Sequence, residues 1–321
     1  MLRSIVVLDA NPANPGDLPW NALEALGDLT VHASTAPDQT WERAGEADVI
    51  VTNKVRLDGT FFARGPKAKL VTILATGTDT VDLDAAKAAG VTVCNVPAYS
   101  TMSTAQMTLA LVLELTQGAG AHSAGVHAGE WARRTTSYWH SPLIELADKQ
   151  WTVVGFGAIG QAVGRIASAL GSRVVAAQLP GRESPERDGV PRVQWADAWQ
   201  SADVVSVHLP LTPDTRRIVG AREMAWLGSE GLLVNTGRGP LVDPVAARAA
   251  LDAGTLGGFA TDVLDVEPPP ADHVLYGAPR CVITPHIAWC TREARTRLLD
   301  ATATNIASYF AGQTTNVVAA P

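Results

Sequence analysis

Three side chains able to perform acid–base and anion-binding chemistry each follow a different apolar run in the second half of the chain. They are Arg238, Glu267 and His286, and the runs that precede them are 232–235, 258–261 and 282–284. Such runs alternate with helical stretches, which predicts a parallel sheet. Because ligands of open parallel sheets bind beyond the carboxyl ends of the strands, we expect the three side chains to converge at one edge of one sheet.

Together these residues suit the transfer of a hydride between a nicotinamide and the carbon of a 2-keto acid. His286 can donate a proton to the carbonyl oxygen, and Glu267 would favour its imidazolium form. Arg238 can hold the substrate carboxylate and polarise the ketone. Each residue also has an ordinary explanation: a surface Arg in a turn, an acid before a proline-rich loop, and a structural His. Their joint position at successive strand ends favours the functional interpretation.

A glycine-rich turn precedes these residues, between a predicted strand at 151–154 and a predicted helix at 161–170. Its sequence is Gly155-Phe156-Gly157-Ala158-Ile159-Gly160. In this context the first Gly permits a tight turn, the second lets a pyrophosphate approach, and the third brings helix and sheet together. Ala158 and Ile159 lie at the helix start, whose N–H groups can bind phosphate. The alternative is a glycine-rich turn in an ordinary α/β domain, which the regular flanking elements disfavour.

The remaining pattern predicts two α/β units. Five β-type runs lie before Pro97, and six follow Trp151, the number expected for two mononucleotide-binding halves. The first set is 5–8, 29–32, 48–52, 70–74 and 91–94; the second is 151–154, 173–177, 204–207, 232–235, 258–261 and 282–284. Residues 101–116 predict a long helix, apolar on nearly every side and therefore buried. We read 117–149 as irregular, and 292–310 as a helix that folds back onto the first unit.

Composition restricts the possible partners and the environment. The chain has 321 residues and a net charge of -7, so neither nucleic acid nor an anionic membrane is expected as a general partner. The longest apolar runs are too short to span a bilayer, and the first residues read as a strand and not as a signal peptide. Three cysteines without paired or metal-type spacing predict a reducing cytoplasm and no metal site. Their positions are Cys94, Cys281 and Cys290.

The chain resembles the D-2-hydroxyacid dehydrogenase family over its whole length. The motifs that carry the resemblance are Gly155–Gly160, Asn235–Gly239, Asp262–Pro268, Pro285-His286 and Ala75–Asp79 with Val81–Leu83. Within the family it is most similar to bacterial glycerate dehydrogenases, which are also hydroxypyruvate reductases. The residues behind this finer likeness are Asn53-Lys54, Val96–Thr101 and His286–Trp289.

This resemblance implies a two-domain α/β fold, with a Rossmann-type doubly wound parallel sheet and a smaller flavodoxin-like parallel domain. The substrate-binding domain would comprise 1–97 and 291–321. The NAD(P)-binding domain would comprise 98–290, including the linker helix 101–116 and a dimerisation arm at 117–149. A catalytic cleft between the domains and a homodimer are implied too. We further expect Trp131 or Trp139 of the arm to reach the partner's cleft.

The resemblance also implies roles for individual residues. Arg238 would anchor the substrate, His286 would be the acid/base and Glu267 its partner. The substrate would also meet Lys54, Ala75, Thr76, Gly77 and Trp289. The cofactor would be held by Thr104, Gly155, Gly157, Ala158, Ile159, Gly160, Gln178, Arg182, Thr236, Gly237 and Asp262.

One position departs from the pattern of the family's NAD-specific members, which carry Asp at the end of the second strand. Here the residue is Gln178, which lies 178 − 160 = 18 positions after the third glycine, and Arg182 follows nearby. Without the carboxylate a 2′-phosphate is not repelled, and Arg182 could pair with it. The alternative is that Gln178 bonds the ribose hydroxyls and Arg182 points into solvent. NADP or NAD thus remains open, and we expect NADP(H) to be accepted.

The predicted activity is reduction of hydroxypyruvate or glyoxylate to D-glycerate or glycolate. A nucleotide-sensing corepressor on the same fold is the alternative from another class, but the acidic chain lacks tails for partner docking. Formate dehydrogenases share the fold, yet their catalytic His is paired with Gln, so Glu267 favours keto-acid chemistry. Which 2-keto acid is preferred is not set by these motifs.

Overall fold

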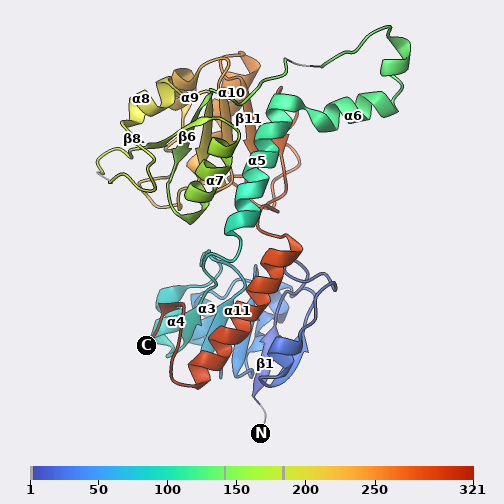
Figure 1. Ribbon diagram of the computed structural model, residues 1–321. Helices are drawn as coiled ribbons and strands as arrows, with labels where there is room; N and C mark the ends of the chain where they lie inside the picture. Colours follow the sequence, from blue (N-terminus) through green and yellow to red (C-terminus); the bar gives the residue numbers. More distant parts are fainter. Residues whose placement is uncertain (1–2, 141, 183–184) are drawn as a thin grey trace. The chain divides into compact units, whose positions relative to one another are not determined.

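The computed structural model describes residues 3–140, 142–182 and 185–321, and it divides into two compact units (Figure 1). The smaller unit comprises Met1–Ser100 and Cys290–Pro321, and the larger comprises Thr101–Trp289. Each is built around one mainly parallel sheet, so the two-sheet α/β architecture predicted from the sequence is confirmed.

The smaller unit has a six-stranded sheet in the order β13-β5-β4-β3-β1-β2. Its strands are β1 (Ser4–Val7), β2 (Asp28–Val31), β3 (Val49–Thr52), β4 (Leu70–Ile73), β5 (Thr92–Cys94) and β13 (Val317–Ala319). Its helices are α1 (Asn21–Glu24), η1 (Pro37–Gln39), α2 (Thr40–Ala44), α3 (Gly59–Ala63), α4 (Leu83–Ala88) and α11 (Arg292–Phe310). Strands β1 to β5 pair in parallel, and the strand order reverses direction at β1, which lies between β2 and β3.

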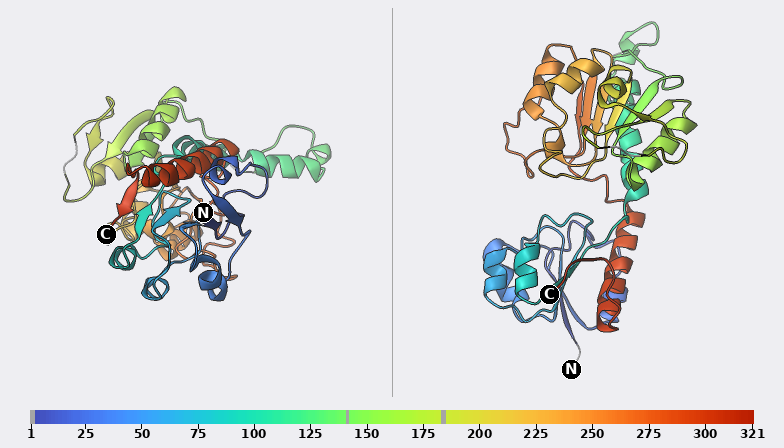
Figure 2. Two further views of the ribbon diagram at one scale, coloured as in Figure 1. Left: turned by 90° about the horizontal axis from the view of Figure 1, so that it is seen from below. Right: turned by 90° about the vertical axis from the view of Figure 1, so that its left-hand side faces the viewer.

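Helices cover both faces of this sheet. Figure 2 shows α11 along one face and the helices α3 and α4 on the other. Helix α11 contacts β4 and α1, although more than 200 residues separate it from them in the chain. The opposite core includes Ile50, Val71, Phe61 and Phe62, all buried. The long C-terminal helix therefore completes the smaller unit by covering apolar strand residues.

The larger unit has a seven-stranded parallel sheet in the order β12-β11-β10-β9-β6-β7-β8. Its strands are β6 (Gln150–Val154), β7 (Arg173–Ala177), β8 (Arg192–Val193), β9 (Val204–Val207), β10 (Leu232–Asn235), β11 (Gly258–Thr261) and β12 (Cys281–Ile283). Its helices are α5 (Thr101–Gln117), α6 (Ala119–His127), η2 (Trp131–Arg133), α7 (Ala158–Ala169), α8 (Trp195–Gln200), α9 (Ala221–Leu227), η3 (Gly239–Leu241) and α10 (Pro244–Asp252). The direction of winding reverses between β6 and β9, as in dinucleotide-binding sheets.

Alternate residues of these strands enter two separate cores. Val153, Val204 and Leu232 pack with α5 and α7, whereas their neighbours Val154 and Val205 pack on the other face. Figure 1 shows α5 and α7 on one side of this sheet and α8, α9 and α10 on the other. Burial on both faces explains why the strands read as continuous apolar runs and not as alternating ones.

Four details of the sequence interpretation were wrong. Strands β8 and β13 were missed, because each is a two- or three-residue edge strand; β13 pairs antiparallel with β5. The arm is not irregular throughout, since it contains α6 and η2. Nor is α5 buried on every side: Met102 and Leu113 are exposed. In the arm, α6 packs against Tyr138 at Gly125. A Cβ at this position would lie 2.7 Å from Tyr138 Oη, so only Gly permits this packing.

Within the described residues no helix is both long enough and apolar enough to cross a membrane. The same part of the chain contains no group of three or more His, Cys, Asp or Glu side chains placed to hold a metal ion.

Candidate active site

The register of the larger sheet aligns the ends of its central strands. Val154 and Asn235 both pair with Val207, and Asn235 also pairs with Thr261, which pairs with Ile283. The residues that follow these strand ends therefore form one row along the carboxyl edge. They are Gly155, His208, Thr236, Asp262 and Thr284. The candidate site is built on this row, where parallel sheets bind ligands.

The glycine turn has the geometry expected of a nucleotide-binding turn. Gly155 has a φ of +94°, and a Cβ there would lie 2.8 Å from the His208 carbonyl carbon across the reversal point. A Cβ at Gly160 would lie 2.2 Å from Gly155 O, so Gly160 lets α7 start against the turn. At Gly157 a Cβ would meet nothing within 4 Å, so the space beside this backbone is open. Ala158 and Ile159 form the first turn of α7, and the cradle fits a pyrophosphate.

Gln178 and Arg182 lie at the end of β7 on the same sheet. Gln178 is buried, and its side-chain amide donates a hydrogen bond to the backbone carbonyl of Arg182. Arg182 is exposed and lies 3.4 Å from Asp214, which is itself exposed. The Gln178 amide therefore closes the short turn after β7, and Arg182 is in a loose surface ion pair.

His286 and Glu267 are in direct contact. His286 Nδ1 donates to Glu267 Oε2 at 2.6 Å, and Glu267 Oε1 accepts from Leu264 N at 3.0 Å. Both side chains are about one third exposed. The ring nitrogen left to exchange a proton with a substrate is Nε2, because Nδ1 faces the carboxylate. This is the arrangement of an oriented acid/base.

Asp262 fixes the loop that carries His286. Its carboxylate accepts hydrogen bonds from Thr284 Oγ1 at 2.6 Å, Ala288 N at 2.8 Å and Ile287 N at 2.9 Å. His286 N also donates to Asp262 O at 2.7 Å, and His286 has a φ of +55°. Burial raises the pKa of the Asp262 carboxyl, an effect that these hydrogen bonds oppose. The structure thus gives Asp262 a role in positioning His286, whereas its contact with the cofactor remains a prediction.

The loop that carries Arg238 follows the neighbouring strand β10 and is also held by side-chain hydrogen bonds to its backbone. Asn235 donates from Nδ2 to Arg238 O at 2.9 Å and accepts from Gly237 N at 3.0 Å. Arg238 is half-buried, and its Nη1 donates to Gly237 O at 3.0 Å. We did not include Asn235 among the site residues; its place within the Asn-Thr-Gly-Arg-Gly motif was the available signal.

The loops of Arg238 and Glu267 are in close contact at Gly239. A Cβ at Gly239 would lie 1.9 Å from Leu264 O, too close for any side chain. The Gly239→Ala variant is therefore expected to force the two loops apart, at a cost of about 1–3 kcal/mol of stability. Both the Tm and kcat should fall. Gly59→Ala serves as the control, because its Cβ would have no neighbour closer than 3.4 Å; an equal effect of both changes would contradict this account.

A buried hydroxyl network links α5 to the row of strand ends. Thr108 Oγ1 contacts Thr236 Oγ1 at 2.9 Å and donates to Thr104 O at 2.9 Å, and Thr236 Oγ1 lies 3.3 Å from His208 Nδ1. Burial lowers the pKa of His208 to about 3, so this imidazole is neutral at working pH and cannot serve as the acid. Its Nε2 is enclosed and has no partner among the described residues. The tertiary setting of His208 alone distinguishes it from His286.

The remaining predicted substrate residues lie mainly in the smaller unit. Ala75, Thr76 and Gly77 follow β4, where Thr76 Oγ1 donates to Val96 O at 2.8 Å. Lys54 follows β3 and is exposed. Trp289 belongs to the larger unit, and its Nε1 donates to His286 O at 2.9 Å. Trp289 is thus tied to the His286 loop. The 75–77 loop is held by its hydrogen bond to Val96, which belongs to the same unit.

Comparison with known proteins agrees with this geometry. Residues 109–288 match the model of the D-isomer specific 2-hydroxyacid dehydrogenase, NAD binding domain. A hydroxypyruvate reductase of Blautia hydrogenotrophica is 38% identical over 318 residues, which cover 98% of this chain and 99% of that protein. The chain belongs to the D-2-hydroxyacid dehydrogenase family. It is accordingly an oxidoreductase that acts on the CH–OH group of 2-hydroxy acids with a nicotinamide cofactor.

Two further members of the dehydrogenase family are similar over most of their length. A glycerate dehydrogenase of Methylorubrum extorquens is 34% identical over 287 residues, covering 88% of this chain and 89% of that protein. The crystal structure of the TT0316 protein from Thermus thermophilus superposes with a TM-score of 0.85 at 32% identity, covering 98% of this chain and 99% of that one. The family predicted from the sequence motifs, and its fold, are thereby confirmed.

Proposed function

We propose that this dehydrogenase reduces hydroxypyruvate or glyoxylate to D-glycerate or glycolate. The observation that carries the proposal is the 2.6 Å contact between His286 Nδ1 and Glu267 Oε2, next to the loop of Arg238. In this mechanism His286 Nε2 donates the proton to the carbonyl oxygen, and Glu267 stabilises the imidazolium form that does so. Arg238 holds the substrate carboxylate and draws electron density from the ketone.

The cofactor site on the larger unit supports this mechanism. Gly155, Gly157 and Gly160 shape the turn, and the first N–H groups of α7 at Ala158 and Ile159 would hold the pyrophosphate. A bound nicotinamide nucleotide supplies the hydride for the carbonyl carbon. Thr104, Thr236, Gly237 and Asp262 would line the nicotinamide end of the site.

Substrate binding is proposed for five further positions. Backbone N–H groups near Ala75, Thr76 and Gly77 would grip the substrate carboxylate, and Lys54 would add a positive charge. Trp289 would limit the size of the substrate, since its indole is fixed to the His286 backbone. Likenesses to a hydroxypyruvate reductase and a glycerate dehydrogenase favour a small 2-keto acid.

The decisive experiment is a panel of 2-keto acids assayed with both NADH and NADPH. Hydroxypyruvate, glyoxylate, pyruvate and 2-ketoisocaproate cover polar, minimal and bulky side chains. We expect the highest kcat/KM for hydroxypyruvate or glyoxylate. A clear preference for 2-ketoisocaproate would contradict the proposed substrate, and absence of turnover with every acid would contradict the proposed chemistry.

We further propose that NADP(H) is accepted, because the residue that follows the last residue of β7 is Gln178 and not a carboxylate. In the Gln178→Asp variant a negative charge would face the 2′-phosphate, and like charges brought together cost several kcal/mol when desolvated. We expect kcat/KM with NADPH to fall by about tenfold or more relative to NADH. Gln178→Asn is the neutral control. An unchanged ratio of NADPH to NADH efficiency in the Asp variant would show that this position does not select the cofactor.

The arm at 117–149 is proposed to hold two copies together as a homodimer. Trp131 and Trp139 are 54% and 65% exposed, and Val126 and Leu143 are also exposed, which is unusual for a monomer surface. The Trp131→Ala/Trp139→Ala double variant should therefore sediment as a monomer at concentrations where the parent is a dimer. If one of these rings also enters the partner's active site, activity falls as well. Unchanged sedimentation would contradict the role of these residues in dimerisation, and unchanged activity would contradict their entry into the partner's active site.

A further inference from the structure

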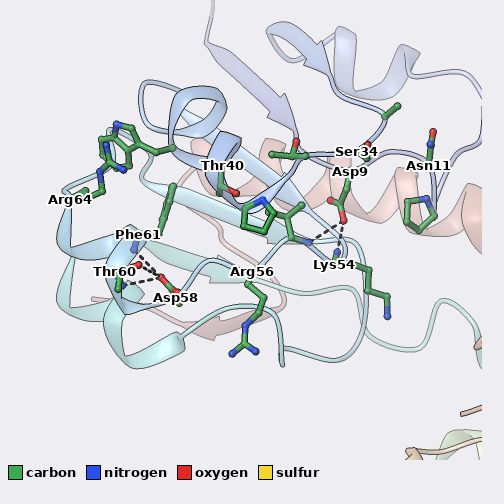
Figure 3. Close-up of a pocket in the computed structure, with 16 residues that line it drawn as sticks. Asp9, Asn11, Ser34, Thr40, Lys54, Arg56, Asp58, Thr60, Phe61 and Arg64 are labelled. Carbon is green, nitrogen blue, oxygen red and sulfur yellow. Dashed lines mark hydrogen bonds between the residues drawn. The ribbon is translucent and has the colours of Figure 1, made fainter. Parts of the chain in front are cut away.

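A pocket of about 790 Å³ lies within the smaller unit, beyond the carboxyl ends of β1, β2 and β3 (Figure 3). Strand β1 has β2 on one side and β3 on the other, so the pocket stands where the direction of winding reverses. Open α/β sheets bind ligands at such a reversal. The volume is in the range of pockets that enclose small molecules. Of the residues that line this pocket, the proposed mechanism uses only Lys54.

Three cations line the pocket, and Arg56 is close enough to Asp58 to help lower the pKa of that carboxyl. Lys54, Arg56 and Arg64 are exposed, and none forms an ion pair with any of the described residues. Arg64 lies over the ring of Trp41, 4.0 Å from its centroid. In Figure 3 Arg64 lies beside one end of the pocket, and the charged ends of Lys54 and Arg56 point away from Asp9. On a chain with a net charge of -7, three exposed cations without a salt bridge around one pocket are a local excess of positive charge.

The two carboxylates of the pocket are already engaged. Asp9 accepts from Asn53 N at 2.8 Å, Lys54 N at 2.5 Å and Val55 N at 3.2 Å. Asp58 caps α3 by accepting from the backbone N–H groups of the next turn, both at 3.0 Å. Both carboxylates are thus occupied by hydrogen bonds from backbone N–H groups and have little capacity left to accept hydrogen bonds from a ligand. The pocket therefore presents donors and positive charge.

We propose that this pocket binds a small organic dianion. Its phosphate or carboxylate groups would pair with Arg56 and Arg64, and its carbon body would lie against Phe61 and Val55. Guanidinium groups suit this task, because their planar donors match both phosphate and carboxylate. We expect the ligand to carry two anionic groups, one for each guanidinium. The reason is that Arg56 and Arg64 come from opposite ends of the 56–64 segment.

Binding in the pocket has a route to the reaction. The Asp9 carboxylate ties down residues 53–55, which carry Lys54 at the rim of the pocket. A ligand that pairs with Arg56 would shift the same short loop, because Arg56 directly follows residues 53–55. We therefore expect the ligand to change KM for the 2-keto acid more than kcat. This consequence rests on the proposed role of Lys54 in substrate binding, whereas the binding itself does not.

The test is titration calorimetry of the full chain, without substrate, at low ionic strength where exposed charges are least screened. The probe is 3-phosphonopropionate, which has two anionic groups and neither a 2-hydroxyl nor a 2-keto group. We expect one site per chain, and a Kd about tenfold weaker in Arg56→Gln and in Arg64→Gln. Lys87→Gln removes one charge outside the pocket and should leave the Kd unchanged. Succinate as second probe distinguishes carboxylate from phosphate preference.

Three results would overturn the proposal. They are absence of binding by both probes, equal binding by the parent and the two Arg variants, and displacement of the probe by hydroxypyruvate, which would make the pocket part of the substrate site. Circular dichroism and thermal melts of the Arg variants establish that they are folded. Because binding is measured without turnover, its failure is distinguishable from failure of the proposed function.

Discussion

Replacement of His286 by Gln is expected to lower kcat for 2-keto acid reduction by about 10²- to 10⁴-fold, the usual contribution of a positioned general acid. The physical reason is that Gln has no proton to release to the carbonyl oxygen, although it can retain a hydrogen bond to Glu267. Steady-state rates with saturating NADPH, measured from pH 5 to pH 9, provide the test.

The nucleotide site provides the internal control for this variant. The glycine turn at Gly155–Gly160 is separate from the His286 loop, so the Kd for NADPH, measured by fluorescence, should change little. Glu267→Gln should give a smaller loss of kcat, because the imidazolium then lacks its stabilising charge. A His286→Gln enzyme that keeps more than about one tenth of the parent kcat would rule out His286 as the acid.

Replacement of Arg238 by Gln is expected to lower kcat/KM by about 10²- to 10³-fold, as does the loss of a donor that stabilises developing charge. Both the grip on the substrate carboxylate and the polarisation of the ketone would be lost. Because the interaction is needed in the ground state and the transition state, KM should rise while kcat falls. Rates over a range of hydroxypyruvate concentrations separate the two parameters.

Arg238→Lys distinguishes charge from geometry in this position. Lys keeps the positive charge but not the planar fork, so it should recover only part of the lost activity. An unchanged Tm in both variants would exclude a fold defect, since Asn235 holds this loop through backbone groups alone. Full activity of Arg238→Lys would contradict bidentate recognition and reduce the role of this residue to a point charge.

Local signals in the sequence were sufficient for the central strands of both sheets and for naming candidate site residues at the strand ends. The glycine turn, the long helix α11 and the runs before Arg238, Glu267 and His286 all carry patterns that act over a few residues. Strand ends could be listed because a run of buried residues stops where the chain leaves the sheet. The motif-based family prediction came from the same short segments.

Short edge elements gave no such signal. Strands β8 and β13 span two and three residues, so neither has a periodicity to detect. Helix α6 has two glycines and no apolar stripe, and it depends on neighbours such as Tyr138 that pack at Gly125. Tertiary contacts override weak local preference in such segments.

By itself the sequence determined that the chain has two α/β units, a nucleotide-binding turn, and an Arg, a Glu and a His at successive strand ends. Only the tertiary structure decided which groups touch: His286 with Glu267 across 19 positions, Asp262 with the His286 loop, and Asp9 with residues 53–55. It also separated a neutral, enclosed His208 from the accessible His286. The reason is that periodicity reports on burial along one element, whereas polar contacts depend on register and distance between elements far apart in the chain.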